Sequence, residues 1–349
     1  VFGIYAGSQA IEQAGLPVWR EALDEAAAAH YADQTGCYVG SGGGAFEVNY
    51  DFFPLMAETK NDLNGFGREL SNMVNPMWLL KSLPNNVLCH ISIRHQLKGP
   101  NGCITNHTSS GILSVIESAW ALREGDAQRV VAVGHDAPIE PQTLLYLDRV
   151  GLIGKDILRP FDQRHDGCLL GEGAASLVLE TEASAQERGA TVLGEYLGGG
   201  DASEGEGLFC IRADGDGLSR AIELALADAQ LKPADVGMVV AHGNGTQESD
   251  ASEAAALLRV FGADMPPVTG FKWSVGHLFA ASGLLDVAVG LEACRRQVVP
   301  GIDPLERLAY ACEGLNVSQQ TRAPRSDVVL VLCRGFAGTN GALLLRAIQ

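Results

Sequence analysis

Positive charge is scarce in this sequence of 349 residues, which has 25 Lys and Arg against 42 Asp and Glu. The net charge of −17 argues against binding to nucleic acid and against docking on an anionic membrane, because both need a basic surface. No apolar run reaches the roughly 18 residues that a membrane span needs, and no signal peptide is visible. These absences predict a cytoplasmic protein. The chain opens at Val1 directly in a helical pattern, so we also expect a further N-terminal segment.

Paired cysteines and nucleotide motifs are also missing. None of the eight cysteines lies in a Cys-x-x-Cys pair, which predicts reduced, buried thiols rather than disulfides or zinc ligands. The histidines show no metal-ligand spacing, so no metal site is predicted. The glycine run at 40–44 lacks the spacing of a P-loop or a Rossmann fingerprint, which argues against nucleotide binding.

What is present is enough apolar material for two fused units, because 46% of the residues are hydrophobic and 19% are charged. Two segments follow one plan, in which amphipathic helical stretches lead into a short apolar strand and a Gly-rich turn. They begin near residues 6 and 218. The similarity predicts an internal duplication with units at 1–185 and 186–349, divided within 182–195.

Three short apolar runs predict strands that are buried on both faces, at 130–133, 238–241 and 328–332. Strands that alternate with helices indicate a layered α/β protein. The polar, Gly-rich stretch at 198–207 is interpreted as a surface loop.

Two histidines are candidates for chemistry. His242 ends a buried strand and is followed by Gly-Asn-Gly-Thr, and ligands of open α/β sheets bind at such strand ends. His277 follows Lys272 by five residues. If the two units are equivalent, the histidines lie near one another and can donate hydrogen bonds to an enolate or oxyanion, with the lysine tuning their protonation. A capping or core histidine is the alternative.

Two turns could also form part of a site. The turn at 103–111 precedes a predicted helix at 111–122, where the helix N-terminus favours negative charge. Its Thr108 is placed as a nucleophile would be, but Thr108, Ser109 and Ser110 are also ordinary N-cap residues, and these residues alone favour a helix cap. The second turn lies within 333–345, a predicted hairpin in which Phe336 is surrounded by glycines that could bring backbone N–H groups to a ligand.

Together these segments resemble the β-ketoacyl-acyl-carrier-protein synthases over essentially the whole chain and in the family's order. The matching segments are Gly99-Pro100 leading to Asn106-His107-Thr108-Ser109-Ser110, RPFDQRHDGCLLGEGAASLVLE at 159–180, AHGNGT at 241–246, KWSVGHLFAASG at 272–283 and GFAGTN at 335–340.

The resemblance implies a thiolase-like, five-layered αβαβα fold and a dimer. It also implies no bound cofactor, because the acyl chain arrives on the phosphopantetheine of an acyl carrier protein. By matching position, the implied roles are catalysis by His242 and His277 with Lys272 in support, an oxyanion hole from the N–H groups of Thr108 and Phe336, and substrate binding by Asn244, Thr246 and Cys168.

The sequence departs from the family at the position that matters most. Thr108 stands where the family has its nucleophilic cysteine, and a hydroxyl is a far weaker nucleophile near neutral pH than a partly ionised thiol. Cys103 lies five residues before Thr108 and cannot replace the lost thiol. Further departures are Asn244 for a threonine, Cys168 for a bulky aromatic residue, and Ala280 and Ala337 for glycines.

Two main hypotheses follow from the resemblance. In the first, the chain is similar to the chain-length factors of type II polyketide and aryl-polyene-type systems and pairs with an active ketosynthase paralogue. In the second, it is an active acyltransferase or malonyl-carrier decarboxylase that uses His242 and His277, with Thr108 or Ser109 accepting an acyl group, and it could then be a homodimer. A regulatory acyl-binding protein and an engineered inactive variant are smaller alternatives, the latter disfavoured because knock-outs usually use Ala, Ser or Gln.

Overall fold

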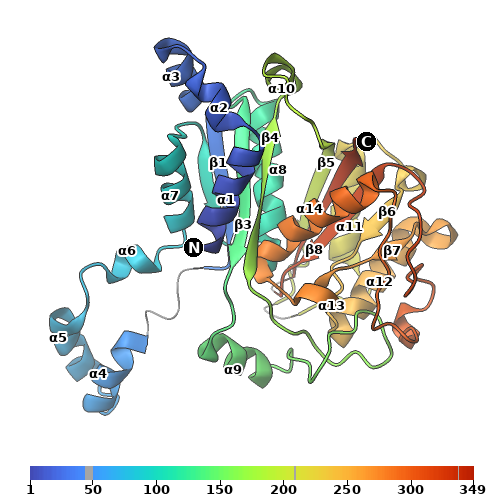
Figure 1. Cartoon of the computed structure of the whole chain (residues 1–349). Helices are drawn as coiled ribbons and strands as arrows, with labels where there is room; N and C mark the ends of the chain where they lie inside the picture. The colour runs from blue at the N-terminus through green and yellow to red at the C-terminus, as the bar shows by residue number, and fades with distance from the viewer. Residues whose placement is uncertain (44–49, 208–209, 337) are drawn as a thin grey trace.

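The computed structural model describes residues 1–43, 50–207, 210–336 and 338–349. Two sheets lie side by side in it, and helices separate and cover them (Figure 1). The first sheet has the order β2-β1-β3-β4, with β4 antiparallel to β3; its strands are β1 Thr35–Ser41, β2 Asn101–Ile104, β3 Arg129–Asp136 and β4 Gly173–Glu180.

The second sheet repeats this plan with one more strand. Its order is β5-β9-β8-β6-β7, and β9 is antiparallel to both of its neighbours. The strands are β5 Gly194–Ser203, β6 Met238–Val240, β7 Val268–Thr269, β8 Val328–Arg334 and β9 Thr339–Ala347. The hairpin predicted within 333–345 is thereby confirmed as the β8–β9 connection.

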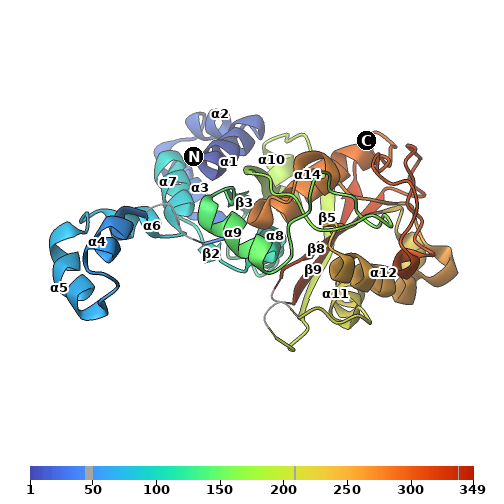
Figure 2. The same cartoon turned by 90° about the horizontal axis from the view of Figure 1, so that it is seen from below.

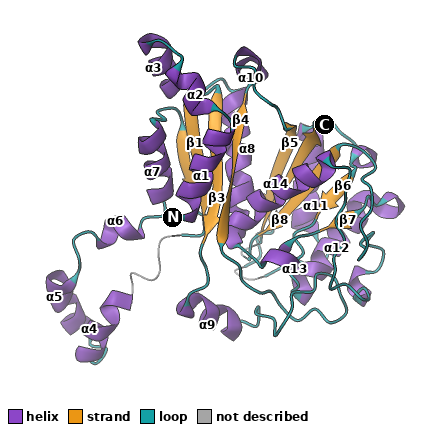
Figure 3. Cartoon of the chain, viewed as in Figure 1, coloured by secondary structure: helices purple, strands orange, loops and turns teal. Residues whose placement is uncertain are grey.

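Helices form the other three layers, which is plain in Figures 1 and 3. The outer layer on the first sheet contains α1 Phe2–Gln13 and α7 Asn86–His95, the middle layer α8 Ser110–Arg123 and α14 Ser282–Arg295, and the outer layer on the second sheet α11 Asp216–Asp228 and α12 Gln247–Phe261. The remaining helices are α2 Leu16–Glu21, α3 Glu25–Asp33, α4 Phe53–Glu58, α5 Leu63–Met73, α6 Trp78–Ser82, α9 Pro141–Arg149, α10 Glu182–Glu187 and α13 Lys272–Val275. The predicted five-layered αβαβα fold is confirmed.

The strands of the second sheet are buried on both faces, as their continuous apolar runs predict. In β8, Leu330 and Leu332 pack in the cluster that faces α11 and α12. The alternate residues Val329 and Val331 pack in the cluster that contains α8 and α14. The middle helices therefore share their core with the sheet, and this fixes the ends of α8 and α14 against each other.

The N-termini of α8 and α14 are built alike, which supports the internal duplication at the level of single bonds. A 3₁₀ turn precedes each helix, and its first residue is left-handed, with φ of 47° at His107 and 45° at Phe279. Ser110 accepts a hydrogen bond from the N–H four residues earlier at 2.7 Å, and Ser282 does the same at 2.9 Å. The division at residue 185 falls inside α10 and stays a prediction.

The surface loop expected at 198–207 is wrong for its first part. Residues 198–203 belong to β5, which pairs with β9 along its length. The glycines there make room for α11: a Cβ at Gly198 would lie 2.6 Å from the nitrogen of Ala229, and one at Gly200 would lie 2.6 Å from the nitrogen of Ala225. Glycine here marks close packing of a helix on a strand, not a turn.

One segment stands apart from the layers. Residues 50–82, which carry α4, α5 and α6 and which we call the arm, project from the body beside the first sheet in both views (Figures 1 and 2). The arm has a small aromatic cluster of its own, in which Phe52 lies 5.5 Å from Trp78 and 6.5 Å from Phe66 between ring centroids. Many of its other apolar side chains face solvent, including Leu63, Met73, Met77, Leu79 and Leu80.

Across the described ranges, no helix is both long and apolar enough to cross a membrane.

Candidate functional site

The turn between β2 and α8 presents Thr108 in the interior of the protein. The left-handed backbone at His107 reverses the chain, and Thr108 is fully buried at the first turn before α8. Hydrogen bonds fix this elbow on both sides: Ser110 accepts from the N–H of Asn106, and Ser109 donates to its carbonyl at 3.0 Å. Among the described residues, the Thr108 hydroxyl has no hydrogen-bond partner, so none of them is placed to take its proton.

His242 and His277 come together from two connections of the second unit. His242 follows β6 and His277 lies between α13 and the turn before α14; their ring centroids are 5.4 Å apart with the planes nearly perpendicular. Both side chains are buried. The juxtaposition that the duplication predicts is present in the structure, while the catalytic role of the pair stays a prediction.

Backbone amides decide which ring nitrogen of each histidine carries the proton. The N–H of Arg334 donates to Nδ1 of His242 at 3.4 Å, and the N–H of Phe279 donates to Nδ1 of His277 at 3.0 Å. An amide can only donate, so each Nδ1 must offer its lone pair and each neutral ring carries its proton on Nε2. Within the described ranges, Nε2 of His277 has no hydrogen-bond partner, so it can donate to a ligand.

Burial keeps both rings neutral. It is the main cause that lowers the pKa of His242 well below its usual range, with the charges of Lys272, His277 and Arg334 acting in the same direction. Burial, followed by the charge of Lys272, lowers the pKa of His277 to about 3. A neutral Nε2–H group can donate a hydrogen bond to a carbonyl oxygen, and this suits the stabilisation of an oxyanion or enolate.

Lys272 is held in a buried ion pair. Its Nζ lies 2.7 Å from Oδ2 of Asp286 on α14, and both side chains are almost fully buried. The sequence analysis found the lysine but missed its partner, because nothing in the spacing of 14 residues distinguishes Asp286 from an ordinary helix carboxylate.

Glu253 is another residue that the sequence analysis missed. Its two carboxylate oxygens accept the N–H groups of His242 at 2.7 Å and of Gly243 at 2.9 Å, so it orients the strand end that carries the histidine. Burial raises its pKa to about 7 in spite of these two hydrogen bonds. The only sequence signal was a glutamate on the buried face of an otherwise ordinary helix.

An apolar cover lies over His277. The ring of Phe336 stacks on it with centroids 5.8 Å apart, and Phe279 lies 4.9 Å away. Cys168, Leu147 and both phenylalanines belong to one buried cluster. This cover places Cys168 and Phe336 beside the site, and it excludes water from the imidazoles; the proposed oxyanion N–H of Phe336 and the substrate role of Cys168 stay predictions. Ala337, one of the glycine replacements, lies outside the described residues.

Asn244 and Thr246, two of the predicted substrate-binding residues, contact one another. Oδ1 of Asn244 accepts hydrogen bonds from the backbone N–H of Thr246 at 3.0 Å and from its hydroxyl at 2.8 Å. Asn244, which replaces a family threonine, therefore already accepts the hydrogen bond that the Thr246 hydroxyl donates. Both residues are buried, and their part in substrate binding stays a prediction.

The remaining cysteines offer no substitute nucleophile at the elbow. Cys333 contacts the elbow, with its thiol 3.2 Å from the carbonyl oxygen of Thr108, but burial raises its pKa to about 12. Cys103 lies in β2, before the elbow. In the parts of the chain that the structure describes, no group of three or more His, Cys, Asp or Glu residues could hold a metal ion.

The five-layered fold, the elbow before α8 and the paired imidazoles define a thiolase-like protein. Comparison with family models agrees: the β-ketoacyl synthase N-terminal domain matches residues 2–185 and the C-terminal domain matches residues 193–305. The chain therefore belongs to the β-ketoacyl synthase family.

Three relatives show the range of the similarity. The chain is 28% identical to 3-oxoacyl-acyl-carrier-protein synthase 2 of Vibrio harveyi over 99% of this chain and 81% of that protein. It is 36% identical to the tetracenomycin polyketide synthase ketoacyl synthase beta subunit of Streptomyces glaucescens over 73% of this chain and 63% of that one. The solved ishigamide ketosynthase/chain length factor superposes with a TM-score of 0.78 at 25% identity, covering 99% of this chain and 82% of that one. The chain thus spans less than two thirds of the length of the tetracenomycin relative.

Proposed function

We propose that this chain is the non-condensing, chain-length-factor-like subunit of a ketosynthase pair in β-ketoacyl chain elongation of the polyketide or fatty-acid type. Its partner is a cysteine-bearing ketosynthase paralogue, and the growing chain is presented on the phosphopantetheine of an acyl carrier protein. The observation that carries the proposal is the buried Thr108 hydroxyl, which stands at the nucleophile position without a hydrogen-bond partner in the part of the chain that the structure describes.

A hydroxyl in this setting does not form an acyl-enzyme. Its ionisation would leave a charge in a buried site, and the neutral imidazoles of His242 and His277 already hold their proton on Nε2 and make no hydrogen bond to Thr108. Condensation needs a thioester on the nucleophile, so the chain depends on a partner for that step.

Two further observations favour a partner subunit. Among the relatives, one is named as a beta subunit of a polyketide ketoacyl synthase, and one solved structure is titled a ketosynthase/chain length factor. The arm carries solvent-exposed leucines and methionines on short helices that pack against little of the chain's own body. Apolar surface of this kind usually marks an interface.

The intact imidazole pair favours a second candidate, decarboxylation of malonyl-carrier protein. The bond between the malonyl carboxylate and its methylene carbon would break to release CO₂, and its electron pair would form an enolate. The Nε2–H groups of His242 and His277 would stabilise the enolate oxygen, and a proton from water would then complete acetyl-carrier. This reaction needs no nucleophile at position 108.

The test combines two measurements on the purified chain. Co-expression with a cysteine-bearing ketosynthase from the same organism should give a stable complex, and only the complex should elongate an acyl-carrier substrate. A chain that condenses fully as a homodimer would refute the subunit proposal. Incubation with malonyl-carrier, read by mass spectrometry, decides the second candidate, because acetyl-carrier must then form with the wild type and be lost with His242→Ala.

A further inference from the structure

A buried ion pair lies one hydrogen bond away from His242. Arg334 ends β8, and its Nη2 lies 2.7 Å from Oε1 of Glu204, which follows β5. The side chains are only 3% and 1% exposed, so solvent does not screen the pair. A buried pair of this kind adds little net stability over apolar residues of the same size, which directs attention to what it holds in place.

The Arg334 guanidinium binds three separate parts of the second unit. Besides Glu204, its Nε donates to Oδ1 of Asn340 in β9 at 2.9 Å, and its Nη1 donates to the carbonyl of Ser249 in α12 at 3.2 Å. A planar fork with several donors fixes its own backbone more firmly than a lysine could. Arg334 is thus clamped between β5, β9 and α12.

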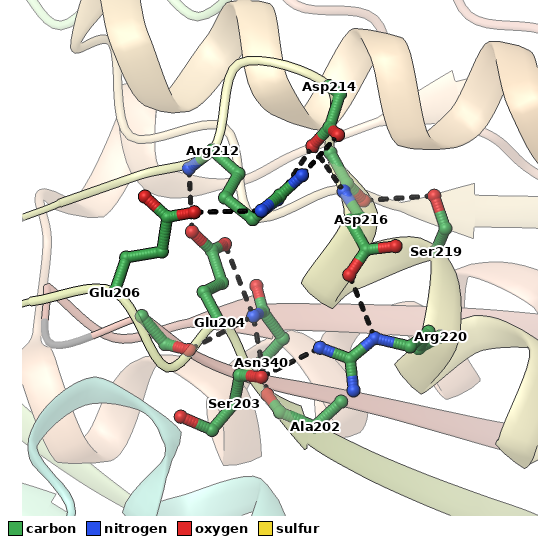
Figure 4. A network of polar contacts seen from close by, with 12 residues as sticks. Ala202, Ser203, Glu204, Glu206, Arg212, Asp214, Asp216, Ser219, Arg220 and Asn340 are labelled. Atoms are coloured by element: carbon green, nitrogen blue, oxygen red, sulfur yellow. Dashed lines mark hydrogen bonds and ion pairs between the residues drawn. The ribbon is translucent and has the colours of Figure 1, made fainter.

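Glu204 is itself anchored at both ends. Its second oxygen accepts the backbone N–H of Arg212 at 2.7 Å, and its own N–H donates to the carbonyl of Gly338 at 2.8 Å. Figure 4 shows Glu204 lying between Arg212 and Asn340, with Arg220 and Asp216 paired at the periphery. The network therefore holds the connection that follows Arg334 against the loop that follows β5.

We propose that Arg334 is a positioning residue for His242, and that its pair with Glu204 keeps its backbone N–H on Nδ1 of the imidazole and so the proton on Nε2. His277 receives its amide from Phe279, two residues along the chain, and does not depend on the network. The inference rests on the proposed function only in that the Nε2–H of His242 is meant to face an acyl-thioester oxygen.

The test reads the proton position directly. The chain is labelled with ¹⁵N at histidine, and two-bond ¹H–¹⁵N correlation spectra distinguish the Nε2–H from the Nδ1–H form of each ring, with His242→Asn and His277→Asn used for assignment. The wild type should show the Nε2–H form for both residues. In Arg334→Met and Glu204→Gln, His242 should show the Nδ1–H form or a mixture, while His277 keeps the wild-type spectrum and reports that the site is folded.

Further variants keep the test decisive. Arg334→Lys retains the charge but not the planar fork. Its His242 should show more of the Nε2–H form than in Arg334→Met but less than in the wild type. Arg220→Met removes an arginine from the rim of the same network and should change neither histidine. If the single variants fail to fold, Glu204→Met/Arg334→Met leaves no charge unpaired and carries the same expectation.

The proposal is overturned if His242 has Nδ1–H in the wild type, or if it keeps pure Nε2–H in every folded variant without Arg334. These spectra need neither substrate nor partner. Failure to decarboxylate or to form a ketosynthase pair would therefore count against the proposed function and leave this result standing, and the reverse also holds.

Discussion

At the residue scale, the side chain at position 108 decides whether the elbow can form an acyl adduct. Thr108→Cys should gain a covalent acyl adduct from an acyl-carrier substrate, because a thiol ionises far more readily than a hydroxyl and position 108 lies at the N-terminus of α8. Intact-protein mass spectrometry measures the adduct. Thr108→Ser is the matched control, since it removes the methyl group without adding a thiol, and it should behave as the wild type, without adduct. A folded Thr108→Cys chain that stays unmodified would show that the rest of the elbow is no longer competent.

The buried ring of His277 should make the protein sensitive to acid. Its pKa is lowered from 6.5 to about 3, so below pH 6.5 the imidazole is protonated in the unfolded chain but stays neutral in the folded chain until the pH approaches 3. Stability from this group is thus complete above pH 6.5 and is lost as the pH falls toward the folded pKa. Between about pH 7.5 and about pH 4.5, the free energy of unfolding of the wild type should fall by roughly 2–3 kcal/mol more than that of His277→Gln.

Denaturant titrations at the two pH values measure this difference, and the comparison cancels other buried groups. Glu253 and Asp136, whose pKa values burial raises to about 7 and about 6, act in the opposite direction in both proteins. A histidine-to-glutamine change at the exposed His30 is the control for the substitution itself. Equal slopes for wild type and His277→Gln would contradict the burial of a neutral ring.

At the scale of elements, the contact between β5 and α11 depends on glycine. Gly200→Ala should destabilise the protein by about 1–3 kcal/mol, because the new Cβ would lie 2.6 Å from the nitrogen of Ala225 and 2.7 Å from Cβ of Leu224. Gly67→Ala is the control, since Gly67 lies in α5 with no atom near its would-be Cβ, and there alanine should be neutral or stabilising by up to about 1 kcal/mol. Chemical denaturation compares the two variants, and equal stabilities would argue against the close approach.

The same glycines mark the limit of what could be predicted from sequence. Apolar runs such as that of β8 identified buried strands correctly, because burial on both faces leaves a local signature. Gly198 and Gly200 led to the wrong prediction of a loop. Glycine is needed there because α11, which comes later in the chain, packs closely against these residues. At the site, the histidines had recognisable flanking motifs, whereas Asp286, Glu253 and the Arg334–Glu204 pair act through contacts between distant segments that no spacing reveals.

At the scale of the whole molecule, the arm is the part whose packing is least complete. Phe52, Phe66 and Trp78 hold its helices together, and Tyr50 ties its base to Glu140 beside α9, yet Leu79 and Leu80 are 56% and 52% exposed. If the arm is an interface for a ketosynthase partner, Leu79→Glu/Leu80→Glu should abolish the complex while leaving the isolated chain folded, because burying two carboxylates without partners is strongly unfavourable. Light scattering after size exclusion of the co-expressed pair measures the complex, and circular dichroism checks the fold. Leu224→Glu is the matched control, at a leucine that is 51% exposed on α11, and it should leave the complex intact. An arm variant that still pairs with wild-type stoichiometry would move the interface to another face, and an assembly lost equally with Leu224→Glu would mean that added charge, not the arm, is what matters.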